Sequence, residues 1–163
     1  MMRDMALACI GCPFYDPDYG CLNVRYDSCP QYVPPKEDHM DKYLVIYPSG
    51  ELRWVELSSN LRRLDQLHQI IGCSCVEQVR TVLPGICIVI DESGKIKSPP
   101  QLHNELASQL YYGYQIGCDN IVGPAVVMAL RPTGPYQELD WFPLDPAELA
   151  KLSLFLGVKI PGK

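Results

Sequence analysis

The sequence predicts an α+β domain, preceded by a small cysteine-rich segment that a metal ion holds together. The domain is predicted because short apolar runs bounded by turn residues alternate with single amphipathic segments, in the order ββαββαββα. The metal-held segment is predicted because four cysteines occur where aliphatic residues are scarce. We therefore expect a zinc-knuckle-like segment over residues 1–38, and over residues 39–163 an antiparallel or mixed sheet with its helices on one face.

The cysteine-rich segment has the spacing C-x2-C-x8-C-x7-C. Its candidate metal ligands are Cys9, Cys12, Cys21 and Cys29. Four thiolates bind zinc in a closed tetrahedron, which stabilises a short segment but leaves no open coordination position for catalysis. We predict a structural zinc ion. An iron–sulfur cluster, which also takes four cysteines, is a less favoured alternative, and free or disulfide-bonded thiols are a third.

Six segments of the domain are predicted as strands, because each joins apolar, β-branched or aromatic residues between turn residues. In chain order they are Tyr43–Tyr47, Glu51–Leu57, Cys75–Val82, Ile86–Ile90, Ile121–Leu130 and Glu138–Phe142. Four more cysteines lie within or beside apolar or glycine-flanked runs, where a thiol behaves as a small hydrophobe. We expect buried thiols at Cys73, Cys75, Cys87 and Cys118.

Three helices are predicted, each from a capping residue at its start and an apolar stripe behind it. Their predicted start and end are Ser58 or Ser59 and Ile71 for the first, Ser98 and Tyr112 for the second, and Asp145 and Gly157 for the third. The second and third begin with the patterns SPPQ and DPAE, which have the spacing of a capping box with proline at the first helical position.

Composition and charge narrow the function and the location. Hydrophobic residues make up 47% of the chain and the formal net charge is −5. This indicates a globular protein and disfavours a nucleic-acid binder, which needs a basic surface. The longest apolar run, residues 121–130, is too short to span a bilayer, and the N-terminus lacks the long apolar core of a secretory signal. We expect a cytoplasmic protein with no membrane partner.

From about residue 42 to residue 157 the chain resembles a known family. The motifs that carry the resemblance follow one another in order: YLVIYPSGELRWVEL, IIGCSCVEQVRTV, DESGKI, HNEL, NIVGPAVVM and LDPAELAKLSLFLG. In their order and spacing they are similar to the domain-of-unknown-function family numbered 3846. The resemblance implies a small protein of a phage or mobile element, which would act in the cytoplasm of the host cell.

A ligand- or partner-binding site is predicted where a polar triplet precedes the second helix and an aromatic stretch follows it. The triplet is His103-Asn104-Glu105, at a helix start whose free N–H groups favour an anionic group, with Lys95 available to offset Glu105. Aromatic residues that can stack on a base or contact a protein are Tyr111, Tyr112 and Tyr114. The alternative is that Asn104 fixes a turn and that the tyrosines pack on the sheet edge.

No Ser-His-Asp order and no phosphate-binding glycine loop is recognisable in the sequence. We therefore predict a non-catalytic binding protein that blocks or sequesters a host component, either a defence protein or a nucleotide-like signal. One alternative is a small accessory enzyme that acts on a nucleotide-like substrate through His103, Asn104 and Glu105. A zinc-finger nucleic-acid binder is the least favoured alternative. The sequence is also compatible with a homo-oligomer.

Overall fold

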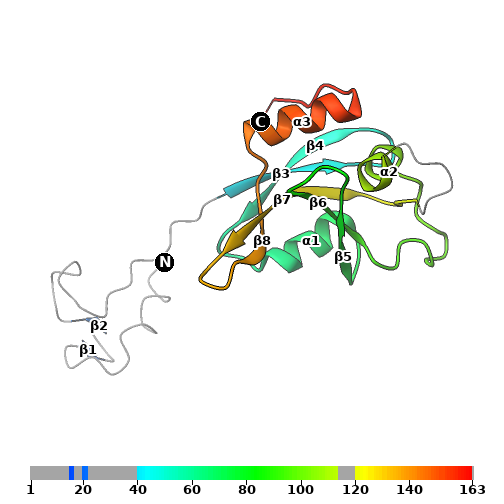
Figure 1. Cartoon of the computed structure of the whole chain (residues 1–163). Helices are drawn as coiled ribbons and strands as arrows, with labels where there is room; N and C mark the ends of the chain where they lie inside the picture. Colours follow the sequence, from blue (N-terminus) through cyan, green and yellow to red (C-terminus); the bar gives the residue numbers. More distant parts are fainter. Residues whose placement is uncertain (1–14, 17–19, 22–39, 114–119, 163) are drawn as a thin grey trace. The chain divides into compact units, whose positions relative to one another are not determined.

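The computed structural model describes residues 15–16, 20–21, 40–113 and 120–162 (Figure 1). The chain divides into two compact units, Met1–Glu37 and Asp38–Lys163. In the first unit, two short strands form an antiparallel pair: β1 (Tyr15–Asp16) and β2 (Gly20–Cys21). All other described elements belong to the second unit.

The second unit is built on a six-stranded antiparallel sheet, which confirms the predicted α+β class (Figure 1). The strand order is β4-β3-β7-β6-β5, and β8 also pairs with β7. The strands are β3 (Met40–Ile46), β4 (Leu52–Ser58), β5 (Val76–Arg80), β6 (Ile86–Asp91), β7 (Ala125–Thr133) and β8 (Glu138–Phe142). Every predicted strand is therefore present, with ends shifted by a few residues.

Helices cover both faces of the sheet, which corrects the expectation that they lie on one face. α1 (Arg63–Ile71) packs through Leu67 and Ile71 on the odd-numbered side chains of β3, such as Val45. α2 (Glu105–Tyr112) and α3 (Pro146–Leu156) pack on the even-numbered ones, such as Leu44. The continuous apolar runs of β3, β6 and β7 already indicate this arrangement. A strand with one solvent-exposed face alternates between apolar and polar residues, and these runs do not.

The sheet divides where β3 and β8 flank the same side of β7. Ala129 of β7 pairs with Ile86 of β6 on one side and with Phe142 of β8 on the other. β3 pairs with β7 only over Leu44–Ile46, on the β8 side. Among the described residues, Met40–Tyr43 pair with β4 alone. The first half of β3 thus diverges from β8, and this opening is where the candidate site lies.

The starts of two helices differ from the predicted ones. α1 begins at Arg63, and its N-cap Arg62 makes no side-chain cap bond, because the predicted cap Ser58 instead accepts a bond from Asn60 N at 3.1 Å in the preceding turn. α2 begins after Asn104, six residues beyond Ser98. The capping box of Asp145, in contrast, is present as predicted at α3.

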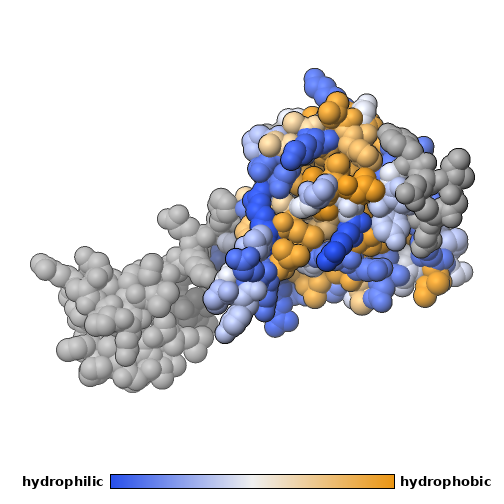
Figure 2. Space-filling model, viewed as in Figure 1, coloured by the Kyte–Doolittle hydropathy of each residue, from blue (hydrophilic) through white to orange (hydrophobic). Residues whose placement is uncertain are grey.

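One face of the second unit shows apolar surface between α3 and the middle of the sheet, with polar side chains around it (Figure 2). Several partly buried residues pack against the core cluster beneath α2 and α3; they include Val79, Leu83, Phe142 and Leu149. After α3, residues 158–162 return over β4, where Trp54 Nε1 donates to the carbonyl oxygen of Pro161 at 2.9 Å.

Candidate functional site

The predicted zinc ligands fall largely outside the described part of the chain. Cys9, Cys12 and Cys29 lie outside the described residues, as do Tyr114 and Cys118. Cys21 ends β2, and only its backbone is described. Over the described ranges of the chain, no group of three or more His, Cys, Asp or Glu side chains is arranged to hold a metal ion. The four-cysteine zinc site therefore stays a prediction.

Asn104 is the buried member of the predicted polar triplet. Its side chain is buried and bonds backbone only: Oδ1 accepts from Ala107 N at 3.1 Å, while Nδ2 donates to the carbonyl oxygens of Ile46 (2.9 Å) and Gly123 (2.8 Å). It caps α2 and ties the helix start to β3 and to the turn before β7. This geometry supports the alternative in which Asn104 fixes a turn.

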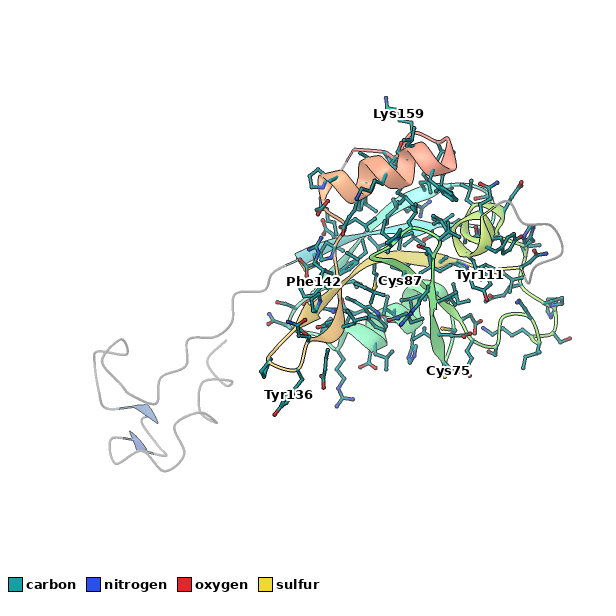
Figure 3. All side chains as sticks on the ribbon, viewed as in Figure 1. Cys75, Cys87, Tyr111, Tyr136, Phe142 and Lys159 are labelled. Atoms are coloured by element: carbon teal, nitrogen blue, oxygen red, sulfur yellow. The ribbon has the colours of Figure 1, made fainter. Side chains whose placement is uncertain are left out.

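The other described residues of the predicted site are less buried than Asn104. His103 Nε2 lies 3.1 Å from Ser108 Oγ, whereas Glu105 and Lys95 are exposed. The Tyr111 and Tyr112 rings meet edge to face at the other end of α2, about 12 Å along an eight-residue helix. Figure 3 labels Tyr111 on α2. The structure therefore separates the triplet from the tyrosines by the length of the helix.

The cysteines of the described region offer no activated thiol. Cys87 lies inside the sheet (Figure 3), and burial raises its pKa to about 12. Burial likewise raises the pKa of the partly buried Cys73 thiol. Cys75 is exposed, which corrects its expected burial, and a hydrogen bond with Glu92 raises its pKa. These thiols stay protonated near neutral pH, whereas a nucleophilic thiol needs a pKa lowered toward neutral pH.

A polar pocket opens where β3 and β8 diverge, and we name it the Tyr43 pocket. It has a volume of about 280 Å³. Its lining comes from β3, β4, the start of α1 and β8, and consists of Asp41, Tyr43, Leu57, Ser58, Ser59, Leu61, Arg63 and Asp140. Because these residues are up to a hundred positions apart in the sequence, no local motif predicts the pocket. The one local signal is the two-residue spacing of Asp41 and Tyr43, which places both side chains on one face of a strand.

Tyr43 lines this pocket, and its hydroxyl is buried without a hydrogen-bond partner among the described residues. Only 1% of the residue is exposed, and among the described residues nothing bonds its oxygen. Burial raises the pKa of the Tyr43 phenol; Arg63 opposes the increase, and Asp41 and Asp140 add to it. Three charged groups therefore act on this hydroxyl, which is a neutral donor at physiological pH.

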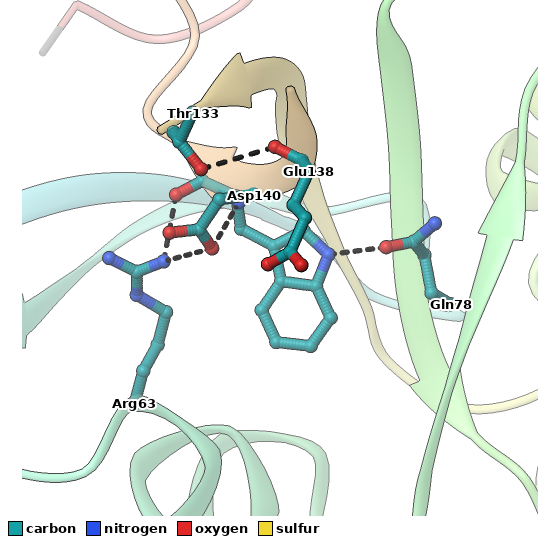
Figure 4. Close-up of polar contacts among 6 residues, drawn as sticks. Arg63, Gln78, Thr133, Glu138 and Asp140 are labelled. Atoms are coloured by element: carbon teal, nitrogen blue, oxygen red, sulfur yellow. Dashed lines mark hydrogen bonds and ion pairs between the residues drawn. The ribbon is translucent and has the colours of Figure 1, made fainter. Parts of the chain in front are cut away.

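Arg63 closes one side of the pocket by joining α1 to β8 (Figure 4). Its Nη1 donates to Asp140 Oδ1 at 3.3 Å and to the carbonyl oxygen of Trp141 at 2.8 Å. The indole of Trp141 in turn donates to the side chain of Gln78 on β5, so β8 is tied across the α1 face of the sheet (Figure 4). Within the described part of the chain, the Arg63 bonds use Nη1 alone, and Nη2 and Nε remain available as donors.

Of the helices that the structure describes, none combines the length and the apolar character needed to cross a lipid bilayer. No curated protein matches the chain significantly. A solved crystal structure of the small RNA methyltransferase HEN1 matches this chain with a TM-score of 0.49 and 15% identity over 72% of this chain. The chain spans only 16% of that protein.

The family resemblance is confirmed by a match over residues 40–140, which takes in the sheet from β3 to the middle of β8 and two of the three helices. The match begins close to the expected residue 42 and ends before α3. It contains every residue that lines the Tyr43 pocket. Since the match covers more than half of the chain, this protein belongs to the domain-of-unknown-function family DUF3846.

Proposed function

We propose that this protein is a non-catalytic binding protein of a phage or mobile element, which sequesters a small ligand or blocks a host component through the Tyr43 pocket. The observation that carries the proposal is Tyr43: the residue lines a polar pocket, and its buried hydroxyl has no hydrogen-bond partner among the described residues. The phage and host setting rests on the family resemblance alone.

An unpartnered buried hydroxyl is unfavourable for the free protein. Leaving such a group unsatisfied costs about 1–3 kcal/mol, and phenylalanine would fill the same core position without that penalty. A ligand that accepts a hydrogen bond from Tyr43 removes this penalty. The relief of the unsatisfied hydroxyl then adds to the free energy of binding. The pocket volume of about 280 Å³ suits a single side chain or a small ring, since whole drug-sized ligands occupy roughly 300–1,000 Å³.

Binding is favoured over catalysis by the state of the reactive groups. Among the described residues, His103 and Ser108 most resemble a nucleophile paired with its base, since His103 Nε2 lies 3.1 Å from Ser108 Oγ. The Ser108 hydroxyl, however, is buried, donates to the carbonyl oxygen of Asn104 at 2.7 Å and accepts from Ile121 N at 2.9 Å. A hydroxyl bonded in this way holds the α2 start together and has no path to a substrate, which nucleophilic catalysis requires.

Native mass spectrometry of the full chain, purified from cells, tests the proposal. The wild type is expected to carry a bound ligand or partner that Tyr43→Phe loses and Tyr47→Phe retains; Tyr47 follows the same strand but lies outside the pocket. A ligand that is released unchanged supports sequestration, whereas one converted over time by purified protein supports the accessory enzyme instead. Equal occupancy in the wild type and in Tyr43→Phe would show that the pocket is not the binding site.

A further inference from the structure

The chemistry of the Tyr43 pocket restricts what it can bind. Two carboxylates, Asp41 and Asp140, face one guanidinium, Arg63, so the lining carries a net charge of −1 while the phenol is neutral. A phosphate or carboxylate ligand would add a second excess negative charge to this lining, and like charges at one site disfavour each other. The pocket charge therefore disfavours anions.

The Tyr43 hydroxyl also disfavours a simple cation. Its proton needs an acceptor, and ammonium or guanidinium groups have donors only. A cation would in addition approach Arg63, whose Nη1 is already held by Asp140 and Trp141. A cation attracted by the aspartates could donate to the Tyr43 oxygen, but it would leave the proton of the hydroxyl without an acceptor.

A neutral group that carries an acceptor beside a donor can bond both Tyr43 and Asp140. Its acceptor accepts a hydrogen bond from the Tyr43 hydroxyl, and its donor bonds Asp140, whose hydrogen bonds within the described part of the chain use Oδ1 and leave Oδ2 as an acceptor. Leu57 and Leu61 supply apolar walls, and the planar guanidinium of Arg63 can stack on a flat ligand. An amide edge, with C=O next to N–H on a planar group, has this combination.

We infer that the Tyr43 pocket recognises the amide edge of a neutral planar group, with Tyr43 donating to its carbonyl and Asp140 accepting from its N–H; this inference rests on the proposed function. Two sources carry the same chemistry. One is the lactam edge of a nucleobase such as uracil or guanine, and the other is the carboxamide of a glutamine or asparagine side chain on a partner protein.

Methyl NMR on the full chain tests the inference with defined probes. The signals followed are the methyl groups of Leu57 and Leu61 in the pocket, and those of Leu152 in the opposite core as a control for folding. The probes are uridine, blocked glutamine, acetate and methylguanidinium. 3-Methyluridine, which lacks the N–H donor, is the matched control for uridine, and a blocked glutamate methyl ester is the control for glutamine.

Uridine or blocked glutamine should shift the pocket signals, and the methylated controls should bind about tenfold more weakly, as expected for one lost hydrogen bond in an enclosed site. Tyr43→Phe should weaken binding by a similar factor with unchanged Leu152 signals, while Tyr47→Phe should bind as the wild type does. A response to uridine alone identifies a nucleobase as the source, and a response to glutamine alone identifies a protein side chain.

Two results would overturn the inference. If acetate or methylguanidinium shifts the pocket signals and neither amide probe does, the ligand class is wrong, although the pocket still binds and the proposed function stands. If no probe shifts them, amide recognition is absent, and the proposed function is then decided independently by the Tyr43-dependent occupancy of the purified protein.

Discussion

Asn104 shows how one buried residue can join three parts of a domain. Its side chain caps α2 and bonds the carbonyl oxygens of Ile46 and Gly123, while its own N–H donates to the carbonyl oxygen of Ile121 at 2.9 Å. The sequence predicts a functional triplet at this position because polar residues at a helix start favour ligands. The partners that make Asn104 structural lie 58 and 19 residues away, so no local pattern shows them.

Asn104→Ala is expected to destabilise the second unit by about 3 kcal/mol, because it removes a helix cap and leaves two buried carbonyl groups unsatisfied. Asn104→Asp keeps the cap acceptor but sets a carboxylate oxygen against those carbonyls, so it should be at least as destabilising. Urea unfolding followed by circular dichroism measures both. A loss of less than about 1 kcal/mol in each variant would contradict the structural role.

The buried carboxylate of Asp91 gives the domain an acid-sensitive element. Burial alone would raise the pKa of Asp91, but the contact with Lys97 and the bonds from Ser93 N and Oγ, each 3.0 Å, outweigh it and hold the pKa below its ordinary value. A carboxyl whose pKa is lowered by folding stabilises the fold above its unfolded pKa. That stabilisation is lost as the pH falls from the unfolded value toward the lower folded value.

Asp91→Asn should therefore cost about 2 kcal/mol at neutral pH, and the difference from the wild type should shrink as the pH falls below about 4. Denaturant unfolding measured across this range tests the prediction. The control is Glu77→Gln on the exposed side of β5, which should show no comparable pH-dependent difference. A difference for Asp91→Asn that stays constant down to strongly acidic pH would exclude the charge as its cause.

At the scale of the elements, the sequence predicts well whatever is determined locally. β8 has the predicted bounds, and α3 has the predicted capping box and the left-handed stop at Gly157, because a cap, a turn and an apolar stripe are all encoded within a few residues. The start of α2 is predicted wrongly because the SPPQ pattern imitates a capping box. In the structure, Gln101 N instead donates to the carbonyl oxygen of Gly94, in a loop whose path depends on distant contacts.

The segment after α3 stabilises the sheet, and its removal is expected to weaken the domain. Val158 and Ile160 pack against the α2–α3 core, and Trp54 bonds the carbonyl oxygen of Pro161. Deleting residues 158–163 should lower the free energy of unfolding by about 2–3 kcal/mol, from lost apolar burial and one hydrogen bond. Leu154→Ala, at a side chain that is 85% exposed on α3, should change it by less than about 0.5 kcal/mol. Equal stability of the deleted and full chains would show that the tail only rests on the surface.

The cysteine segment is expected to fold only with metal, since thiolate binding supplies the folding energy in such small modules. Elemental analysis of the purified chain should find about one zinc per molecule. Replacing Cys9 or Cys29 by serine should abolish binding, while Cys75→Ser, at an exposed thiol of the second unit, should leave it intact. Less than about half an equivalent of zinc or iron per chain would contradict this prediction.

For the whole molecule, the two core clusters lie entirely within the second unit. We therefore expect a fragment of residues 38–163 to unfold cooperatively, with a thermal midpoint within about 5 °C of that transition in the full chain, because no described core residue is removed. Differential scanning calorimetry of both proteins measures this. A fragment without a cooperative transition would show instead that the cysteine segment completes the core.

The double covering of the sheet also limits how this family can diverge. In the central stretches of β3, β6 and β7, residues 43–46, 86–91 and 125–129, every side chain is enclosed by one core cluster or the other, or is the bonded Asp91. No position there can drift to a polar residue without burying an unpaired group, and a change in volume calls for a compensating change on a neighbouring strand. We expect relatives to vary more along β5 and on the outer faces of the helices, while most positions in the middle of the sheet exchange only among apolar residues.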